Sequence, residues 1–101
     1  MSVQESSVLP TANQKKTNNW NWLALCFDER TANGYAGSHV INAGFMKGTT
    51  FQIMSLLLDL RLEFSKVSGA CLEASGADQA VLNHLIKSGE RRAELEVEAT
   101  L

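Results

Sequence analysis

Asp28 and His39 would matter most for chemistry if they lay side by side. A carboxylate beside an imidazole orients the ring and raises its pKa, as general acid–base catalysis requires. A two-residue turn at Asn33-Gly34 would place the pair opposite each other on two strands. Because the spacing brings no serine or cysteine nucleophile beside them, an exposed cross-strand pair is the favoured interpretation. We predict no enzyme activity, and a small enzyme using this pair is the least favoured alternative.

Lys47, Gly48, Thr49 and Thr50 stand at the start of a predicted helix. Free amides at a helix N-terminus favour anions, and a lysine with two hydroxyl groups would add to that attraction. The order differs from a P-loop, in which Gly-Lys-Ser/Thr follows a longer glycine-spaced loop. We interpret the segment as a capped helix start. Binding or sequestering a nucleotide or phosphate at these four residues is the alternative function.

The potential soft metal ligands are Cys26, Cys71, His39 and His84, and they show neither CxxC nor HxxxH spacing. The sequence therefore predicts no metal and no cofactor. We interpret the cysteines as reduced, buried thiols of a cytoplasmic protein, with one disulfide as the alternative for an exported chain. The start MSVQESSVLP lacks the features of a signal peptide, and the longest apolar run is too short to span a membrane.

Trp20 and Trp22 share one face of a predicted strand, and tryptophan is enriched at interface hot spots. Core or subunit packing is the ordinary interpretation, and contact with a protein partner is the preferred functional one. We predict a partner-binding surface of apolar strand residues together with glutamates that would meet a basic partner surface. Its members are Trp20, Trp22, Leu25, Phe27, Glu94, Glu96 and Glu98.

The overall charge disfavours direct binding to nucleic acid. Nine Lys and Arg against eleven Asp and Glu give a net charge of −2, and the pI is about 5.6. Nucleic-acid binders usually show a high pI and a basic patch. Stacking of bases on the tryptophans is disfavoured for the same reason.

The first 18 residues are mostly polar and are predicted to be a flexible leader, although Val8 and Leu9 could dock. Residues 19–101 are predicted to be a single domain. Its first elements would be strands at 19–30 and 35–45, joined by a turn at Asn33-Gly34.

A helix is predicted from Thr49, where Gln52 gives the spacing of a capping box. Its main apolar stripe is Ile53, Leu57, Leu60, Phe64 and Val67. A second row, Phe51, Met54, Leu58 and Leu62, makes the apolar arc wider than one sheet contact requires. The helix is expected to stop at Ser68-Gly69 or to continue as far as Gly76. The broad arc predicts a neighbouring helix, from this chain or from a second copy.

A second helix is predicted over 78–88, ending before Gly89. The last residues alternate between apolar and acidic from Ala93 to Leu101, which predicts a half-buried strand, with a helix as the alternative. The expected fold is therefore an α+β domain of ββααβ order. It would have an antiparallel three-stranded sheet with two helices packed on one face.

A sheet covered on one face leaves apolar surface open, so we expect a homo-oligomer, by default a homodimer. The function favoured by the small size and the missing catalytic sets is a non-enzymatic protein-binding module. It would act as an inhibitor or adaptor on a larger protein or ribonucleoprotein. Small inhibitors encoded by phages or mobile elements are proteins of this build.

Overall fold

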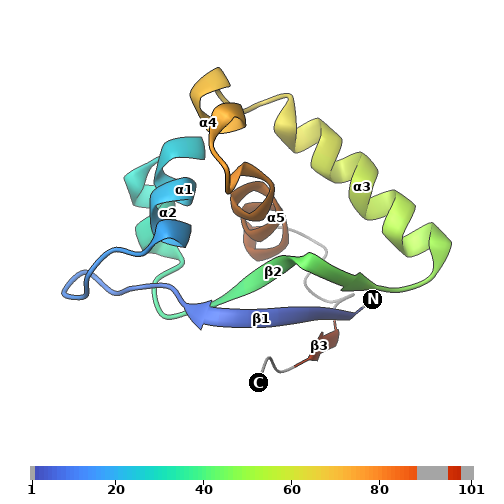
Figure 1. The fold of residues 1–101 in the computed structure, drawn as a ribbon, viewed down its shortest axis with the longest axis horizontal. Helices are drawn as coiled ribbons and strands as arrows, with labels where there is room; N and C mark the ends of the chain where they lie inside the picture. The colour runs from blue at the N-terminus through green and yellow to red at the C-terminus, as the bar shows by residue number, and fades with distance from the viewer. Residues whose placement is uncertain (1, 89–95, 99–101) are drawn as a thin grey trace.

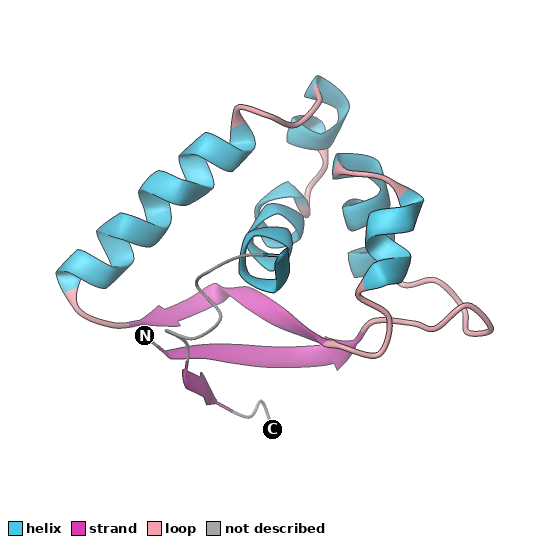
Figure 2. Ribbon diagram, turned by 180° about the vertical axis from the view of Figure 1, so that it is seen from behind, coloured by secondary structure: helices cyan, strands magenta, loops and turns pink. Residues whose placement is uncertain are grey.

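The computed structural model describes residues 2–88 and 96–98. The helices of the described residues lie on one side of a small sheet (Figures 1 and 2). In chain order the elements are β1 (Ser2–Val8), α1 (Asn18–Cys26), α2 (Glu29–Gly34), β2 (His39–Lys47), α3 (Thr50–Phe64), α4 (Gly69–Glu73), α5 (Ala77–Ser88) and β3 (Glu96–Glu98).

The sheet has the order β2-β1-β3. β1 runs antiparallel to β2, and the three-residue β3 pairs with β1 in parallel. The structure is an α+β fold, but the predicted antiparallel three-stranded sheet with two helices is wrong. The described residues form five helices, and the third strand is short and parallel.

The predicted strand at 19–30 is wrong, because this segment forms α1 and begins α2. Thr17 caps α1, and its hydroxyl accepts a hydrogen bond from the Trp20 amide at 3.4 Å. Asp28 caps α2, and its carboxylate accepts one from the Thr31 amide at 2.6 Å. Side-chain acceptors at these positions satisfy amides that a first helical turn leaves unpaired.

The predicted turn at Asn33-Gly34 is also wrong, since both residues end α2. A type I′ turn requires positive φ at both central residues. Among the described residues only Gly37 has a positive φ, at 80°. β2 therefore starts after Gly37, at His39 rather than at Tyr35, and the Asn33 side chain accepts from the Trp20 indole at 3.0 Å.

Part of the predicted flexible leader is strand β1. Strand pairing uses backbone groups, so a polar segment can join a sheet wherever a neighbouring edge is open. Leu9, next to β1, is fully buried, and its amide and carbonyl pair with Ser38 and Gly37 at 2.8 and 2.9 Å. The docking foreseen for Leu9 is present, whereas Val8 stays exposed.

The two predicted helices are confirmed as α3 and α5. The capping box joins Thr49 and Gln52 through two hydrogen bonds of 3.0 and 3.1 Å. α3 stops at Phe64, earlier than predicted, and the residues after it form the separate helix α4. β3 lies within the predicted final strand, and the rest of that segment lies outside the described residues.

The core lies between α5 and the elements on either side of it. Its larger part joins α1, α2 and α5 around buried Leu23, Ala32 and Val81. Its smaller part joins β2, α3 and α5 and is made of Ile41, Leu56, Leu82 and Ile86. Cys26 and Cys71 form a disulfide that ties α1 to α4, with a Cα–Cα distance of 4.6 Å.

Candidate functional site

Two amide side chains, one turn apart on α5, fix the edge of β2. Asn83 is buried; its oxygen accepts from the Ile41 amide at 2.7 Å and its nitrogen donates to the Ile41 carbonyl at 2.8 Å. Gln79 accepts from the Ala43 amide at 3.2 Å and donates to Asn19. An edge strand otherwise offers unpaired backbone groups to other chains. This edge of β2 is therefore occupied from within the molecule at these positions.

α3 contributes only one side of its apolar surface to the core. Leu56 is fully buried against α5 and β2, and Leu60 is packed partly between the two halves of the core. The row that points away from the core is largely exposed, and we call it the α3 face. Its members are Phe51 (82% exposed), Met54 (57%), Leu58 (60%) and Leu62 (62%).

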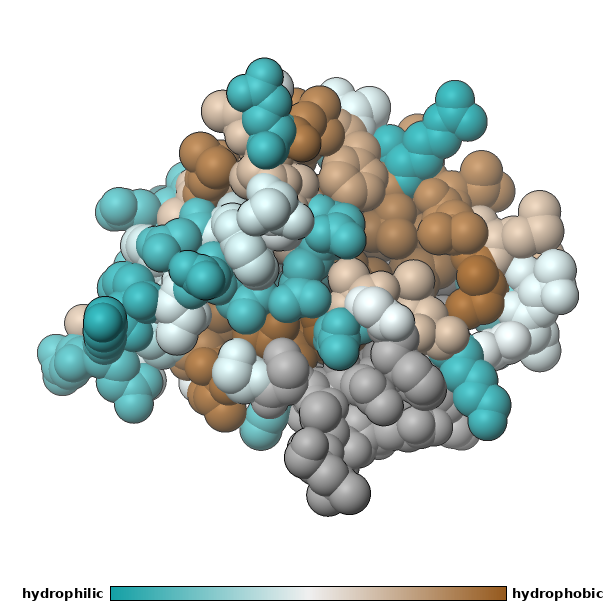
Figure 3. Space-filling model, viewed as in Figure 1, coloured by the Kyte–Doolittle hydropathy of each residue, from teal (hydrophilic) through white to brown (hydrophobic). Residues whose placement is uncertain are grey.

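The α3 face lies in an extended apolar surface. The space-filling view shows apolar side chains gathered over α3, seen from the same side as Figure 1 (Figure 3). Exposed apolar residues are common when scattered singly, but contiguous exposed patches mark interaction sites. Helical spacing places Phe51, Met54, Leu58 and Leu62 along one side of α3. They therefore form a contiguous exposed patch of the kind that marks an interaction site.

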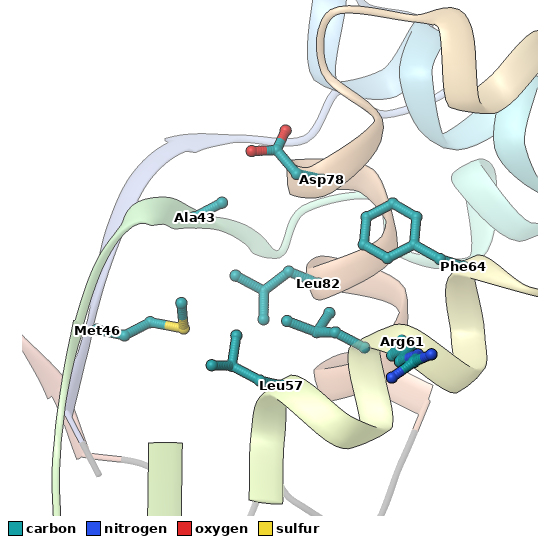
Figure 4. Close-up of a pocket in the computed structure, with 8 residues that line it drawn as sticks. Ala43, Met46, Leu57, Arg61, Phe64, Asp78 and Leu82 are labelled. Atoms are coloured by element: carbon teal, nitrogen blue, oxygen red, sulfur yellow. The ribbon is translucent and has the colours of Figure 1, made fainter. Parts of the chain in front are cut away.

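An apolar pocket of about 400 Å³ opens between β2, α3 and α5, and we call it the α3 pocket. Figure 4 shows Met46 from β2, Leu57 from α3 and Leu82 from α5 pointing toward one another. The other lining residues are Ala43, Leu60, Arg61, Phe64 and Asp78. Leu57 and Arg61 are also exposed on the surface of α3, so they connect the pocket to the α3 face.

The chemistry of this site suits an apolar anchor. Arg61 and Asp78 are the charged residues of the lining, and both side chains are exposed. Such a mostly apolar concave site with a few polar groups is typical of binding pockets. In the described part of the chain no group of three or more His, Cys, Asp or Glu could hold a metal ion.

The four predicted partner-binding residues between 20 and 27 do not share one exposed surface. Trp20 is buried in the core, and Trp22 packs beside Gly76, where an added Cβ would lie 1.9 Å from the Trp22 ring. Phe27 is half-buried and stacks on His84, with ring centroids 3.9 Å apart. Leu25 is 49% exposed on α1.

The predicted acidic residues lie at the other end of the chain. Glu96 and Glu98 are in β3, and Glu94 lies outside the described residues. The α3 face, not the aromatic residues of 20–27, thus carries the exposed apolar row. The signal for it was present in the sequence as the second row along the helix.

The predicted pair of Asp28 and His39 is not formed, because the hairpin that would align these residues is absent. Asp28 caps α2 instead, and hydrogen bonds from Thr31 lower its pKa. The histidine near Asp28 is His84, whose Nδ1 lies 2.8 Å from the Tyr35 hydroxyl. Burial lowers the pKa of His84, while the charges of Glu63 and Asp28 oppose that shift.

Lys47, Gly48, Thr49 and Thr50 are exposed at the junction of β2 and α3. The capping box uses the Thr49 hydroxyl and the amides of Thr49 and Gln52. These two amides are therefore paired within the helix start itself.

The interpretation of the cysteines as reduced thiols is wrong in this structure, since Cys26 and Cys71 are bonded. Both residues are buried, as predicted. None of the helices within the described ranges is long and apolar enough to cross a membrane.

No known protein family, curated protein or solved structure matches this chain. The case for its function therefore depends on the geometry of the α3 face and the α3 pocket.

Proposed function

We propose that the chain is a non-enzymatic protein-binding module that docks on another protein chain through the α3 face and acts as an inhibitor or adaptor. The observation that carries this proposal is the uncharged row from Phe51 to Leu62, exposed along a helix whose opposite side is in the core. An amphipathic helix that displays an apolar row is a recurring means of recognising proteins.

The α3 pocket supports the same proposal. Interface hot spots are large side chains that fill desolvated pockets near the centre of a contact. The pocket adjoins the α3 face at Leu57 and Arg61 and is large enough for an aromatic ring, since a cavity of about 150 Å³ already holds benzene. The α3 face thus offers apolar side chains for a partner to cover, and the α3 pocket offers space for one of the partner's side chains.

The disulfide bears on where this docking takes place. Disulfides persist in oxidising compartments and are rare in the cytosol. The Cys26–Cys71 bond therefore favours an oxidising compartment over the cytoplasmic location expected from the sequence.

The test is site-specific photo-crosslinking in the cells that produce the chain. A photoreactive amino acid at position 58 lies on the α3 face, and one at position 25 is the matched control, since Leu25 is also exposed but lies on α1. We expect a covalent protein adduct from position 58 in clear excess over position 25. Equal yields, or no adduct from position 58, would contradict the proposal.

A further inference from the structure

We propose that the occupant of the α3 face is a second copy of this chain, paired antiparallel about a two-fold axis, with Phe51 of each protomer seated in the α3 pocket of the other. This inference deepens the proposed function, on which it rests, because it names the partner of the same surface. The dimer is then the form that acts as an inhibitor or adaptor.

The α3 face has the composition that a self-complementary contact needs. A two-fold interface uses the same patch on both subunits, so any charge in the patch meets its own kind near the axis. The row Phe51, Met54, Leu58 and Leu62 carries no charge. Arg61, which flanks it, lies toward one end of α3, so two-fold symmetry sends the two arginines to opposite ends of the contact.

The spacing along α3 places Phe51 of one protomer at the level of the α3 pocket of the other. If the axis passes at the level of Leu56, Phe51 of one protomer faces Arg61 of the other, because both lie five positions from 56. Met54 then faces Leu58, since both lie two positions from 56. The α3 residues of the pocket are Leu57, Leu60, Arg61 and Phe64, which centre on the level of Arg61.

The Phe51 side chain is 82% exposed, which is unusually high for a phenylalanine. The pocket it would enter encloses about 400 Å³ and is walled by Leu57, Met46 and Leu82. Arg61 at the pocket mouth could lie over the inserted ring, where a guanidinium is attracted to the aromatic face. The contact is made twice in each dimer.

The area available is sufficient for a dimer. At roughly 200 Å² for a large apolar side chain, the exposed fractions of the α3 face and Leu57 amount to about 600 Å² per protomer. Two copies would then bury about 1,200 Å², the lower end of the range for specific protein interfaces.

The experiment removes the Phe51 ring in one variant, fills the α3 pocket in another, and then mixes the two variants. Phe51→Ala keeps the pocket but has no ring to insert, and its exposed site should not disturb folding. Ala43→Trp fills the pocket but keeps Phe51. Leu25→Ala is the control on α1. Masses are measured by sedimentation velocity over a range of concentrations, with circular dichroism to verify folding.

We expect the wild-type chain and Leu25→Ala to form dimers. Each single variant should raise the dimer dissociation constant at least tenfold, and the equimolar mixture should recover part of the loss, because one heterodimer contact is intact. A monomeric wild type at about 100 μM overturns this inference, as does an unchanged dimer of Phe51→Ala. If Ala43→Trp fails to fold, Phe51→Ala alone decides.

The outcomes also separate this inference from the proposed function. A monomeric purified chain that still gives an adduct of another protein from position 58 overturns the pairing and leaves the docking proposal in place. A monomer that gives no such adduct overturns both.

Discussion

At the scale of single residues, the Asn83 side chain makes the hydrogen bonds to β2 that an adjacent strand would otherwise make. Its side chain pairs with both backbone groups of Ile41 and donates a third hydrogen bond, of 2.8 Å, to the Gln79 carbonyl. A buried amide with its partners satisfied specifies one register between helix and strand. α5 is thereby fixed against β2, and the α3 pocket is formed on the same two elements.

Asn83→Ala should lower the free energy of unfolding by about 2–4 kcal/mol, because it leaves the buried amide and carbonyl of Ile41 without partners. Urea denaturation measures the change. The control Asn21→Ala, at an exposed position on α1, should stay within about 0.5 kcal/mol. A loss below about 1 kcal/mol for Asn83→Ala would show that these bonds do not fix the strand.

Gly76 is a second residue with a specific role. A Cβ at this position would lie 1.9 to 2.3 Å from the Trp22 ring, so Gly76→Ala should destabilise the protein by about 1–3 kcal/mol through overpacking. Gly34→Ala is the matched control, since nothing lies within 4 Å of its added Cβ. The melting temperatures of the two variants test the difference, and equal values would contradict the close approach of Trp22.

His84 makes stability depend on pH, because its pKa is lowered in the folded state and the unfolded chain binds the proton more readily. Its contribution is complete above the unfolded value of about 6.5 and is lost as the pH falls toward the lower folded pKa. Thermal melts at pH 7.5 and 5.5 should therefore differ less for His84→Gln than for the wild type. An identical pH dependence would exclude His84 as a cause.

At the scale of elements, the covalent link between α1 and α4 stands out. α4 has five residues, and its described anchors are the Ser68 cap and the buried Cys71, bonded to Cys26. The bond closes a loop with a sequence separation of 45, which constrains the unfolded chain. It thus holds the far end of α3 and the start of α5 in place through the segment that joins them.

Reduction of the disulfide should cost about 3–4 kcal/mol of unfolding free energy, given the loop length. The measurement is urea denaturation with and without a reductant, together with a thiol assay of the denatured chain. We expect no free thiol before reduction and two after it. Two free thiols in the untreated protein would contradict the bond.

The helices that have a clear capping motif or a long apolar periodicity were predictable from the sequence. Thr49 and Gln52 mark the start of α3, and the apolar periodicity of α3 and α5 is long enough to identify helices. α1 was predicted as a strand because its apolar run is short, and short runs do not separate helix from strand. The spacing of Trp20, Leu23 and Phe27, together with Thr17 as cap, is the helical signal that was available.

At the scale of the whole molecule, the expected surplus of apolar surface is present on one of the two elements that were predicted to carry it. The sequence predicted open apolar surface on a hairpin and along a broad arc of the helix from Thr49, and the structure has it on α3. Of the tryptophans in that supposed hairpin, Trp20 is part of the core and Trp22 packs against it, because the segment is the helix α1. Which apolar row stays exposed depends on tertiary packing, and the pattern along one helix does not contain that information.

The site could be predicted only in part for the same reason. The row Phe51, Met54, Leu58 and Leu62 is readable from helical spacing alone. The pocket beside it needs Met46 from β2 and Leu82 from α5, which are brought together by long-range packing. β1 could not be predicted from the sequence either, because strands pair through backbone groups and a polar segment shows no apolar pattern that would indicate the pairing.

The most direct test of the pairing of two α3 faces is the mass of the wild-type chain in solution, measured by light scattering at about 100 μM with the disulfide intact. We expect a dimer of about 22 kDa, twice the chain mass of 11.0 kDa, and a shift toward 11.0 kDa for Phe51→Ala. A wild-type mass of 11.0 kDa at this concentration would contradict the pairing of two α3 faces.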